Sequence, residues 1–137
     1  MKKPNIDIID DLKKCSLDAL RDGYYIESSI IIFQAVEQLL RILISGIAKA
    51  KNVKEDITNR CYIEEQSFSR LITYYELLDP NNELTDRLKK LNQNRNSMIH
   101  RIFYDFESLT CLKDELREFI KEAVKLNELI RSELNSN

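Results

Sequence analysis

The chain has 137 residues, a length that suits one domain with a single hydrophobic core. Hydrophobic residues make up 43% of the chain and charged residues 32%, with only 2 Gly and 2 Pro, which excludes a disordered chain and disfavours a many-stranded sandwich. A formal net charge of -2 excludes a protein that coats nucleic acid by bulk charge, so any RNA or DNA contact must be local. These features predict an all-α domain spanning residues 1–137.

Two helices are predicted in the first third of the chain. Apolar residues recur at three- and four-residue spacings over Asn5–Arg21 and again over Tyr24–Lys51. Gly23, between them, is expected to adopt the left-handed conformation that closes a helix. The second helix has two apolar faces, which predicts burial on two sides, either within the bundle or against another subunit.

This second helix is the most apolar part of the chain, yet it is not expected to span a membrane. Glu27, Glu37 and Arg41 interrupt it, and a membrane-spanning helix seldom tolerates such residues. The first residues contain no apolar run of signal-peptide length. A soluble cytoplasmic protein without membrane contact is therefore predicted.

Three further helices are predicted after a polar loop at Lys51–Cys61. The third spans about Ile63–Leu78, and the fourth begins near Glu83, after a turn in which Asn81 or Asn82 is suited to cap it. The last runs to about Leu134, with Ser108 or Thr110 as its cap. The predicted fold is a five-helix bundle with an antiparallel up-down core.

The cysteine pattern gives no sign of a disulfide framework or a zinc site. Cys15, Cys61 and Cys111 are odd in number, widely separated and lack C-x-x-C spacing. We expect them to be buried free thiols in a reducing compartment. Asp105, Glu107 and Asp114 match no metal-binding spacing either, so no metal or other cofactor is expected.

The segment "LNQNRNSMIHRIFY" carries the strongest functional signal. It contains the chain's only histidine, His100, together with Arg95 and Asn96. Between Arg87 and Arg101 there are several Lys and Arg but no Asp or Glu, which predicts a local positive patch suited to a phosphodiester. Within this patch the expected RNA-binding residues are Lys89, Lys90 and Arg101.

These residue types support RNA cleavage without a metal ion. His100 can accept the proton of a ribose 2'-OH or protonate the leaving 5'-oxygen, Arg95 can hold the phosphate as charge builds, and the Asn96 amide can orient either. On a regular helix, however, Arg95 and His100 point about 140° apart at 100° per residue. Either the helix is irregular between Asn92 and Ser97, or two copies of the segment meet across a two-fold axis, and the second explanation is favoured.

The fragment "RNSMIH", Arg95 to His100, resembles the R-N-x-x-x-H form of the HEPN-domain motif. Its surroundings are also similar: a long apolar second helix containing "FQAVEQLLRILI", and a motif that precedes a final amphipathic helix. The resemblance implies a HEPN-like bundle, often a homodimer, in which Arg95 and His100 of two copies cut single-stranded RNA with Asn96 in support. It also implies a setting in toxin-antitoxin or phage-defence systems.

One feature of HEPN toxins paired with nucleotidyltransferase antitoxins is not matched. These toxins continue as H-x-Y, whereas here Arg101 and Ile102 follow His100 and the first tyrosine is Tyr104. Tyr104 lies four residues past His100 and is expected to share its helix face, in a supporting role. The alternative function is a non-catalytic HEPN module that binds a nucleotide or a nucleotidyltransferase partner, and a plain helical scaffold is a third.

Other polar residues have both a functional and a structural interpretation. Glu27 and Glu37 are candidate partners of Arg95, although charged residues on a helix usually form a solvated face. The tyrosines of the first two thirds of the chain could stack on RNA bases, but edges of the core or of an interface are the simpler explanation; they are Tyr24, Tyr25, Tyr62, Tyr74 and Tyr75.

Overall fold

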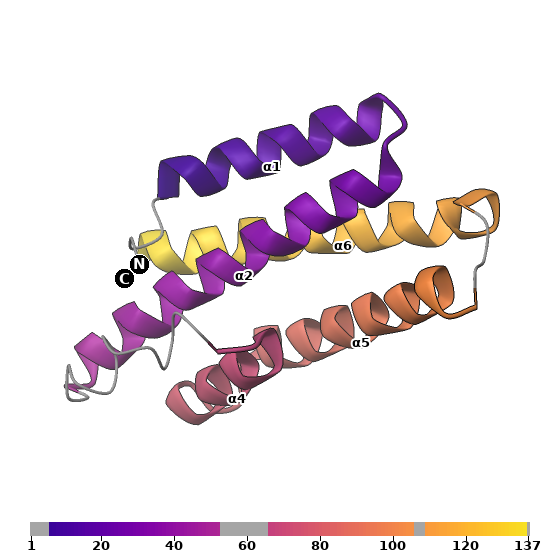
Figure 1. The fold of residues 1–137 in the computed structure, drawn as a ribbon. Helices are drawn as coiled ribbons and strands as arrows, with labels where there is room; N and C mark the ends of the chain where they lie inside the picture. The colour runs from indigo at the N-terminus through magenta and orange to yellow at the C-terminus, as the bar shows by residue number, and fades with distance from the viewer. Residues whose placement is uncertain (1–5, 53–65, 106–108, 137) are drawn as a thin grey trace.

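A computed structural model describes residues 6–52, 66–105 and 109–136 of the chain. These residues form five α-helices and no strand, which confirms the predicted all-α bundle. The helices are α1 (Ile6–Arg21), α2 (Tyr25–Ala50), α4 (Phe68–Leu78), α5 (Glu83–Phe103) and α6 (Leu109–Ser136). Figure 1 shows that α1 and α6 lie along α2, whereas α4 and α5 form the lower part of the bundle.

Helix α2 is the centre of the bundle. Its backbone contacts α1, α4 and α6, whereas α5 is held mainly through α4 and α6. The helix is long and apolar enough to cross a membrane by length and composition, but half of its most apolar window is buried inside the bundle. Ile32, Val36, Leu39 and Leu40 are fully buried in one continuous core that includes residues of all five helices. The apolar character of α2 is thus accounted for by packing within the bundle.

The connection between α1 and α2 follows from one glycine and a pair of serines. Gly23 has a φ of +87°, as predicted for the residue that closes α1. Ser16 and Ser28, both fully buried, exchange hydrogen bonds: each hydroxyl donates to the other's carbonyl oxygen, at 2.8 and 2.7 Å. Because both hydroxyls are satisfied, two polar residues can be buried between α1 and α2, close to the connection.

The other helix ends agree only partly with the sequence patterns. α4 begins at Phe68 rather than Ile63, because the Ser67 hydroxyl accepts a hydrogen bond from the Arg70 amide and caps the helix there. Ile63 and most of the predicted loop before the helix lie outside the described residues. Asn82 caps α5 by accepting from the Leu84 amide at 2.9 Å, as predicted.

Two predictions near the last helix and the cysteines need correction. α6 begins at Leu109, so Thr110 lies inside the helix and is not its cap, while Ser108 is outside the described residues. The helix continues to Ser136, past the predicted end at Leu134. Cys15 and Cys111 are exposed rather than buried, because both lie on outward helix faces; Cys61 is outside the described residues.

Tyr75 is the largest fully buried side chain, and its hydroxyl oxygen has no hydrogen-bond partner among the described residues. Burial, together with the charges of Asp79 and Glu133, raises the pKa of Tyr75 well above its ordinary value of 10.0. The folded state therefore disfavours the phenolate. The stability associated with this group is fully present below pH 10 and is lost as the pH rises above the ordinary tyrosine value, where the unfolded chain ionises.

Substituting Tyr75→Phe is expected to raise the free energy of unfolding by about 1 kcal/mol at neutral pH, because it removes a buried hydroxyl without a partner. The gain should increase between pH 9 and pH 11, roughly the range in which unfolded tyrosine ionises. Urea unfolding at several pH values measures both effects. Tyr74→Phe on the half-buried neighbour is the matched control, and an equal alkaline gain in that variant would contradict the assignment to Tyr75.

Candidate functional site

The sequence motif lies on the second half of α5, which is an unbroken helix from Glu83 to Phe103. The polar stretch from Asn92 to Ser97 does not interrupt it, so the explanation that relied on an irregular helix is wrong. Arg95 and His100 therefore diverge by about 140° around the helix axis. Asn96, which is exposed, lies one turn before His100 on the same side. One chain does not direct Arg95 and His100 to a common point.

Arg95 lies over an aromatic ring of the central helix. Its guanidinium carbon is 4.4 Å from the centroid of the Phe33 ring on α2, a cation–π contact. Phe33 is itself buried, with its centroid 4.7 Å from that of Phe68 on α4 and 6.3 Å from that of Phe119 on α6. The position of Arg95 is thus set by an aromatic cluster that joins three other helices.

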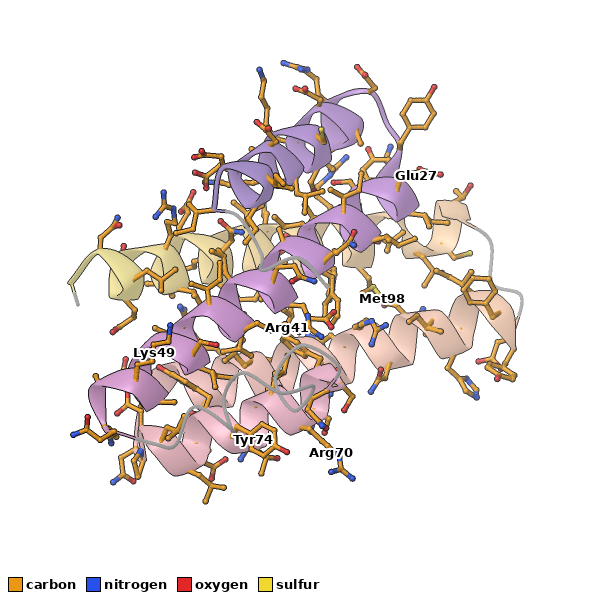
Figure 2. All side chains as sticks on the ribbon, turned by 60° about the vertical axis from the view of Figure 1, so that its left-hand side comes forward. Glu27, Arg41, Lys49, Arg70, Tyr74 and Met98 are labelled. Atoms are coloured by element: carbon orange, nitrogen blue, oxygen red, sulfur yellow. The ribbon has the colours of Figure 1, made fainter. Side chains whose placement is uncertain are left out.

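Arg95 lines a groove between α2 and α5, with a volume of about 480 Å³. The floor contains Leu116 and Phe119 of α6, and Met98, which projects from α5 in the region between α5 and the other helices (Figure 2). The polar residues at the groove, besides Arg95, are Ser29, Gln34 and Glu37. Its apolar walls are formed by Ile26, Ile30, Ile99, Ile102 and Phe103.

The walls of this groove are unusually exposed for large apolar side chains. Ile30 is 62% exposed on α2, and Phe103 is 66% exposed on α5, with Ile99 also exposed. Contiguous apolar residues around a groove mark an interaction surface more often than isolated ones do. We call this set of Ile30, Ile99 and Phe103 around the groove the α2–α5 face.

His100 lies outside the groove, near the end of α5. Its side chain is 63% exposed, its Nδ1 is 3.5 Å from Oδ2 of Asp105, and its ring stacks on Tyr104 with centroids 5.0 Å apart. The His100 carbonyl oxygen accepts hydrogen bonds from the amides of both Tyr104 and Asp105, at 2.8 and 3.2 Å. The way in which α5 ends thus brings Asp105 next to the imidazole.

Asp105 and Phe33 were not identified as site residues from the sequence. The sequence presents Asp105 only as one of three acids, with Glu107 and Asp114, that match no metal-binding spacing, and Glu107 is outside the described residues. No spacing rule relates a residue to the imidazole five positions earlier, because the contact depends on where the helix ends. Phe33 appears in the sequence only as one of many core residues of α2, without a sign that Arg95 packs on it.

The predicted positive patch is partly neutralised by acids from other helices. Nζ of Lys89 lies 2.7 Å from Oε2 of Glu76 on α4, and this contact raises the pKa of Lys89. Arg101 pairs with Glu115 of α6. The segment from Arg87 to Arg101 therefore contains no acid in sequence, but in the structure Lys89 and Arg101 contact carboxylates of other helices.

Lys90 lines a second hollow, of about 640 Å³, between α5 and α6. Arg87 lies there too, with its Nε 3.9 Å from Oε1 of Glu122. The hollow contains four carboxylates of α6, namely Asp114, Glu115, Glu118 and Glu122. Its charge is therefore less favourable for a phosphodiester than the sequence alone indicated.

Among the described residues, no group of three or more His, Cys, Asp or Glu side chains is arranged to hold a metal ion.

Glu37, a candidate partner of Arg95, lines the groove that contains Arg95, but its carboxylate pairs with Arg41 at 2.7 Å. Arg41 also donates to the carbonyl oxygen of Gln66 at 2.9 Å. Figure 2 shows Arg41 and Glu27 well separated along α2.

The chain matches no protein-family model, no curated protein and no solved structure.

The contact between His100 and Asp105 predicts which imidazole nitrogen carries the proton in the neutral ring. A carboxylate beside Nδ1 stabilises the Nδ1–H form, leaving Nε2 as the acceptor. Because His100 is the chain's only histidine, a long-range ¹H–¹⁵N spectrum at about pH 8.5, where imidazole is ordinarily neutral, reports this tautomer directly. Asp105→Asn should shift the ring toward Nε2–H.

Asp114→Asn, which makes the same charge change on α6, is the matched control and should leave the His100 spectrum unchanged. Identical spectra for the native chain and Asp105→Asn would show that Asp105 does not orient the ring.

Proposed function

We propose that this protein is a HEPN-type, metal-independent endoribonuclease that cuts single-stranded RNA at a site shared between two subunits. The observation that carries the proposal is the division of the motif. Arg95 lies in an apolar groove on one side of α5, and His100 lies exposed on another side. The HEPN-like, antiparallel up-down topology and the cytoplasmic location belong to the same proposal.

A second copy of the chain is the partner that the α2–α5 face suits best. The face presents exposed apolar residues of two helices around a groove, and the groove contains one half of the motif. In a two-fold dimer a residue on the axis contacts the same residue of the other copy. A residue beside the axis contacts a different residue of the other copy, and the reciprocal contact also forms. His100 follows Ile99 directly on α5, so docking of two α5 segments brings His100 of one copy toward Arg95 of the other.

The chemistry proposed for this shared site needs one histidine and one arginine. Nε2 of His100 accepts the proton of a ribose 2'-OH, and the 2'-oxygen attacks the adjacent phosphorus as the bond to the 5'-oxygen breaks. The 5'-oxygen takes a proton from solvent, and His100 returns its proton to solvent. The products are a 2',3'-cyclic phosphate and a 5'-hydroxyl. Arg95 of the other copy stabilises the charge that builds on the phosphate oxygens.

Neighbouring residues have supporting roles in this proposal. Asp105 orients the imidazole through Nδ1, and Tyr104 supports the ring by stacking. Asn96, one turn before His100, holds the phosphate or the ring through its amide. Lys89, Lys90 and Arg101 remain predicted RNA contacts, which would require RNA to compete with the carboxylates beside them.

The second candidate function is a non-catalytic HEPN module that binds a nucleotide or a nucleotidyltransferase-type antitoxin. The pairing of Lys89 and Arg101 with carboxylates favours it, because it reduces the positive charge available to a long RNA. Intact RNA after prolonged incubation with the purified protein would support this function over the nuclease.

Mixing two inactive variants tests the shared site. Arg95→Ala and His100→Ala should each abolish cleavage of single-stranded RNA measured in excess EDTA. Random re-pairing of equal amounts makes half of the dimers mixed, and each mixed dimer has one complete site of two, so activity should return to about a quarter of the native value.

The outcomes of this mixing experiment are distinct. Undiminished cleavage by both single variants would reject the catalytic roles, and absence of recovery on mixing would place Arg95 and His100 of one site in the same subunit. Circular dichroism and urea unfolding confirm that each variant is folded. Removal of Arg95 should lower the free energy of unfolding by only about 1 kcal/mol, the value of a partly exposed cation–π contact.

Phe103→Glu tests the α2–α5 face as the dimer interface. The substitution places a charge at an exposed position of that face, so it should convert dimers to monomers and abolish cleavage with less than about 0.5 kcal/mol of change in monomer stability. Light scattering measures the oligomeric state. Leu77→Glu, at a position 72% exposed on α4, is the matched control and should remain dimeric and active. A dimeric Phe103→Glu variant would reject this interface.

A further inference from the structure

A pair of basic residues on α6 lies beside a tyrosine of α2, away from the motif. Nη2 of Arg117 donates a hydrogen bond to the Tyr25 hydroxyl at 2.9 Å. The guanidinium carbon of Arg117 is 5.6 Å from the centroid of the Tyr25 ring, and Nζ of Lys113 is 5.5 Å from it. Lys113 and Arg117 are one turn apart on α6, so both cations stand against the same ring.

The surroundings of this pair differ from those of the basic residues that the sequence made most prominent. Within the described part of the chain, neither Lys113 nor Arg117 lies within ion-pair distance of a carboxylate, in contrast to Lys89 and Arg101. The hydrogen bond from Arg117 is the main cause that lowers the pKa of Tyr25, and the charges of both cations act in the same direction. Both cations thus place positive charge beside the Tyr25 hydroxyl, while the charges of Asp114 and Glu118 also act on Arg117.

The position of the pair relates it to the motif. Tyr25 begins α2 and Lys113 lies in the early turns of α6, and Figure 1 shows these two helix starts at the same end of the bundle as the last turn of α5. Ile26 and Leu116, the chain neighbours of Tyr25 and Arg117, line the groove that contains Arg95. An RNA strand that leaves the shared site at the edge of this groove can therefore continue past Tyr25.

The chemistry of the three side chains suits one unpaired nucleotide. Arginine offers a fork of N–H donors to phosphate oxygens and lysine adds a point charge. The half-buried Tyr25 ring offers the part of its surface that remains in solvent for stacking of a base, without selecting the base's identity. We propose that Tyr25, Lys113 and Arg117 form a phosphate-binding subsite for single-stranded RNA that flanks the cleavage site, an inference that rests on the proposed ribonuclease function.

Binding in a background that does not cleave RNA tests this subsite. Anisotropy of a fluorescein-labelled single-stranded RNA of about 12 nucleotides, titrated with the His100→Ala protein, gives the affinity across a series of salt concentrations. Adding Lys113→Ala and Arg117→Ala should weaken binding about tenfold or more at low salt. It should also reduce the slope of log K against log salt by about 1.4, which is 0.7 for each lost phosphate contact.

The matched control removes two other cations of α6, Lys121 and Lys125, by alanine substitution. It makes the same change in net charge and should keep the affinity within about twofold and the slope unchanged. Equal weakening in this control would overturn the subsite, because bulk charge would then explain the effect. A double Lys113 and Arg117 variant that binds like its parent, or a parent that binds no RNA at low salt, would overturn it as well.

This outcome is separable from that of the nuclease test. RNA binding that depends on Lys113 and Arg117, in a native protein that never cleaves RNA, would keep the subsite and reject the catalysis. Cleavage by the native protein with binding that does not depend on these two cations would do the reverse.

Discussion

The packing around the Phe33 ring is the interaction on which the rest of the site depends. The ring packs against Phe68 of α4 and Phe119 of α6, and it supports the guanidinium of Arg95 on α5. The backbones of α2 and α5 have few close contacts, so this side-chain cluster does much to set their separation. The separation in turn leaves a groove that is floored by α6 and open to solvent. Because Arg95 packs on the face of a buried ring at the edge of the groove, its charge stays accessible to a ligand and is not buried in the core.

Continuity of α5 is the second constraint, and it determines what one chain can do. A regular helix directs residues five apart to different sides, and no break relieves this between Arg95 and His100. The same continuity leaves Ile99 and Phe103 exposed beside the motif. Exposed apolar area of this kind is unfavourable in a monomer. Both features are explained together if a second copy covers the face and supplies the missing residue.

Much of the fold could be predicted from the sequence because it depends on local periodicity. The stripes of α1 and α2, the left-handed Gly23 and the Asn82 cap all follow from short-range rules, and the structure agrees with them. The sequence pattern places the start of α4 too early, because apolar residues before Ser67 extend the pattern past the cap. The surroundings of the site were harder to predict. Glu76 and Glu115, which neutralise Lys89 and Arg101, are distant in sequence, and the contact of Asp105 with His100 depends on the last turn of α5.

The distribution of charge bears on the proposed action on RNA. A net charge of -2 gives no long-range attraction to a polyanion, so the proposed function requires that affinity for RNA come from a few cations that are not already paired. Pairing of Lys89 and Arg101 removes the cations that the sequence made most prominent. Among the described residues near the groove, Arg95 lies on Phe33, and Lys113 and Arg117 lie on Tyr25, so each is a cation against an aromatic ring. Such a surface offers phosphate contacts and stacking at a few points, which suits a short unpaired segment and not a duplex, whose bases are already stacked.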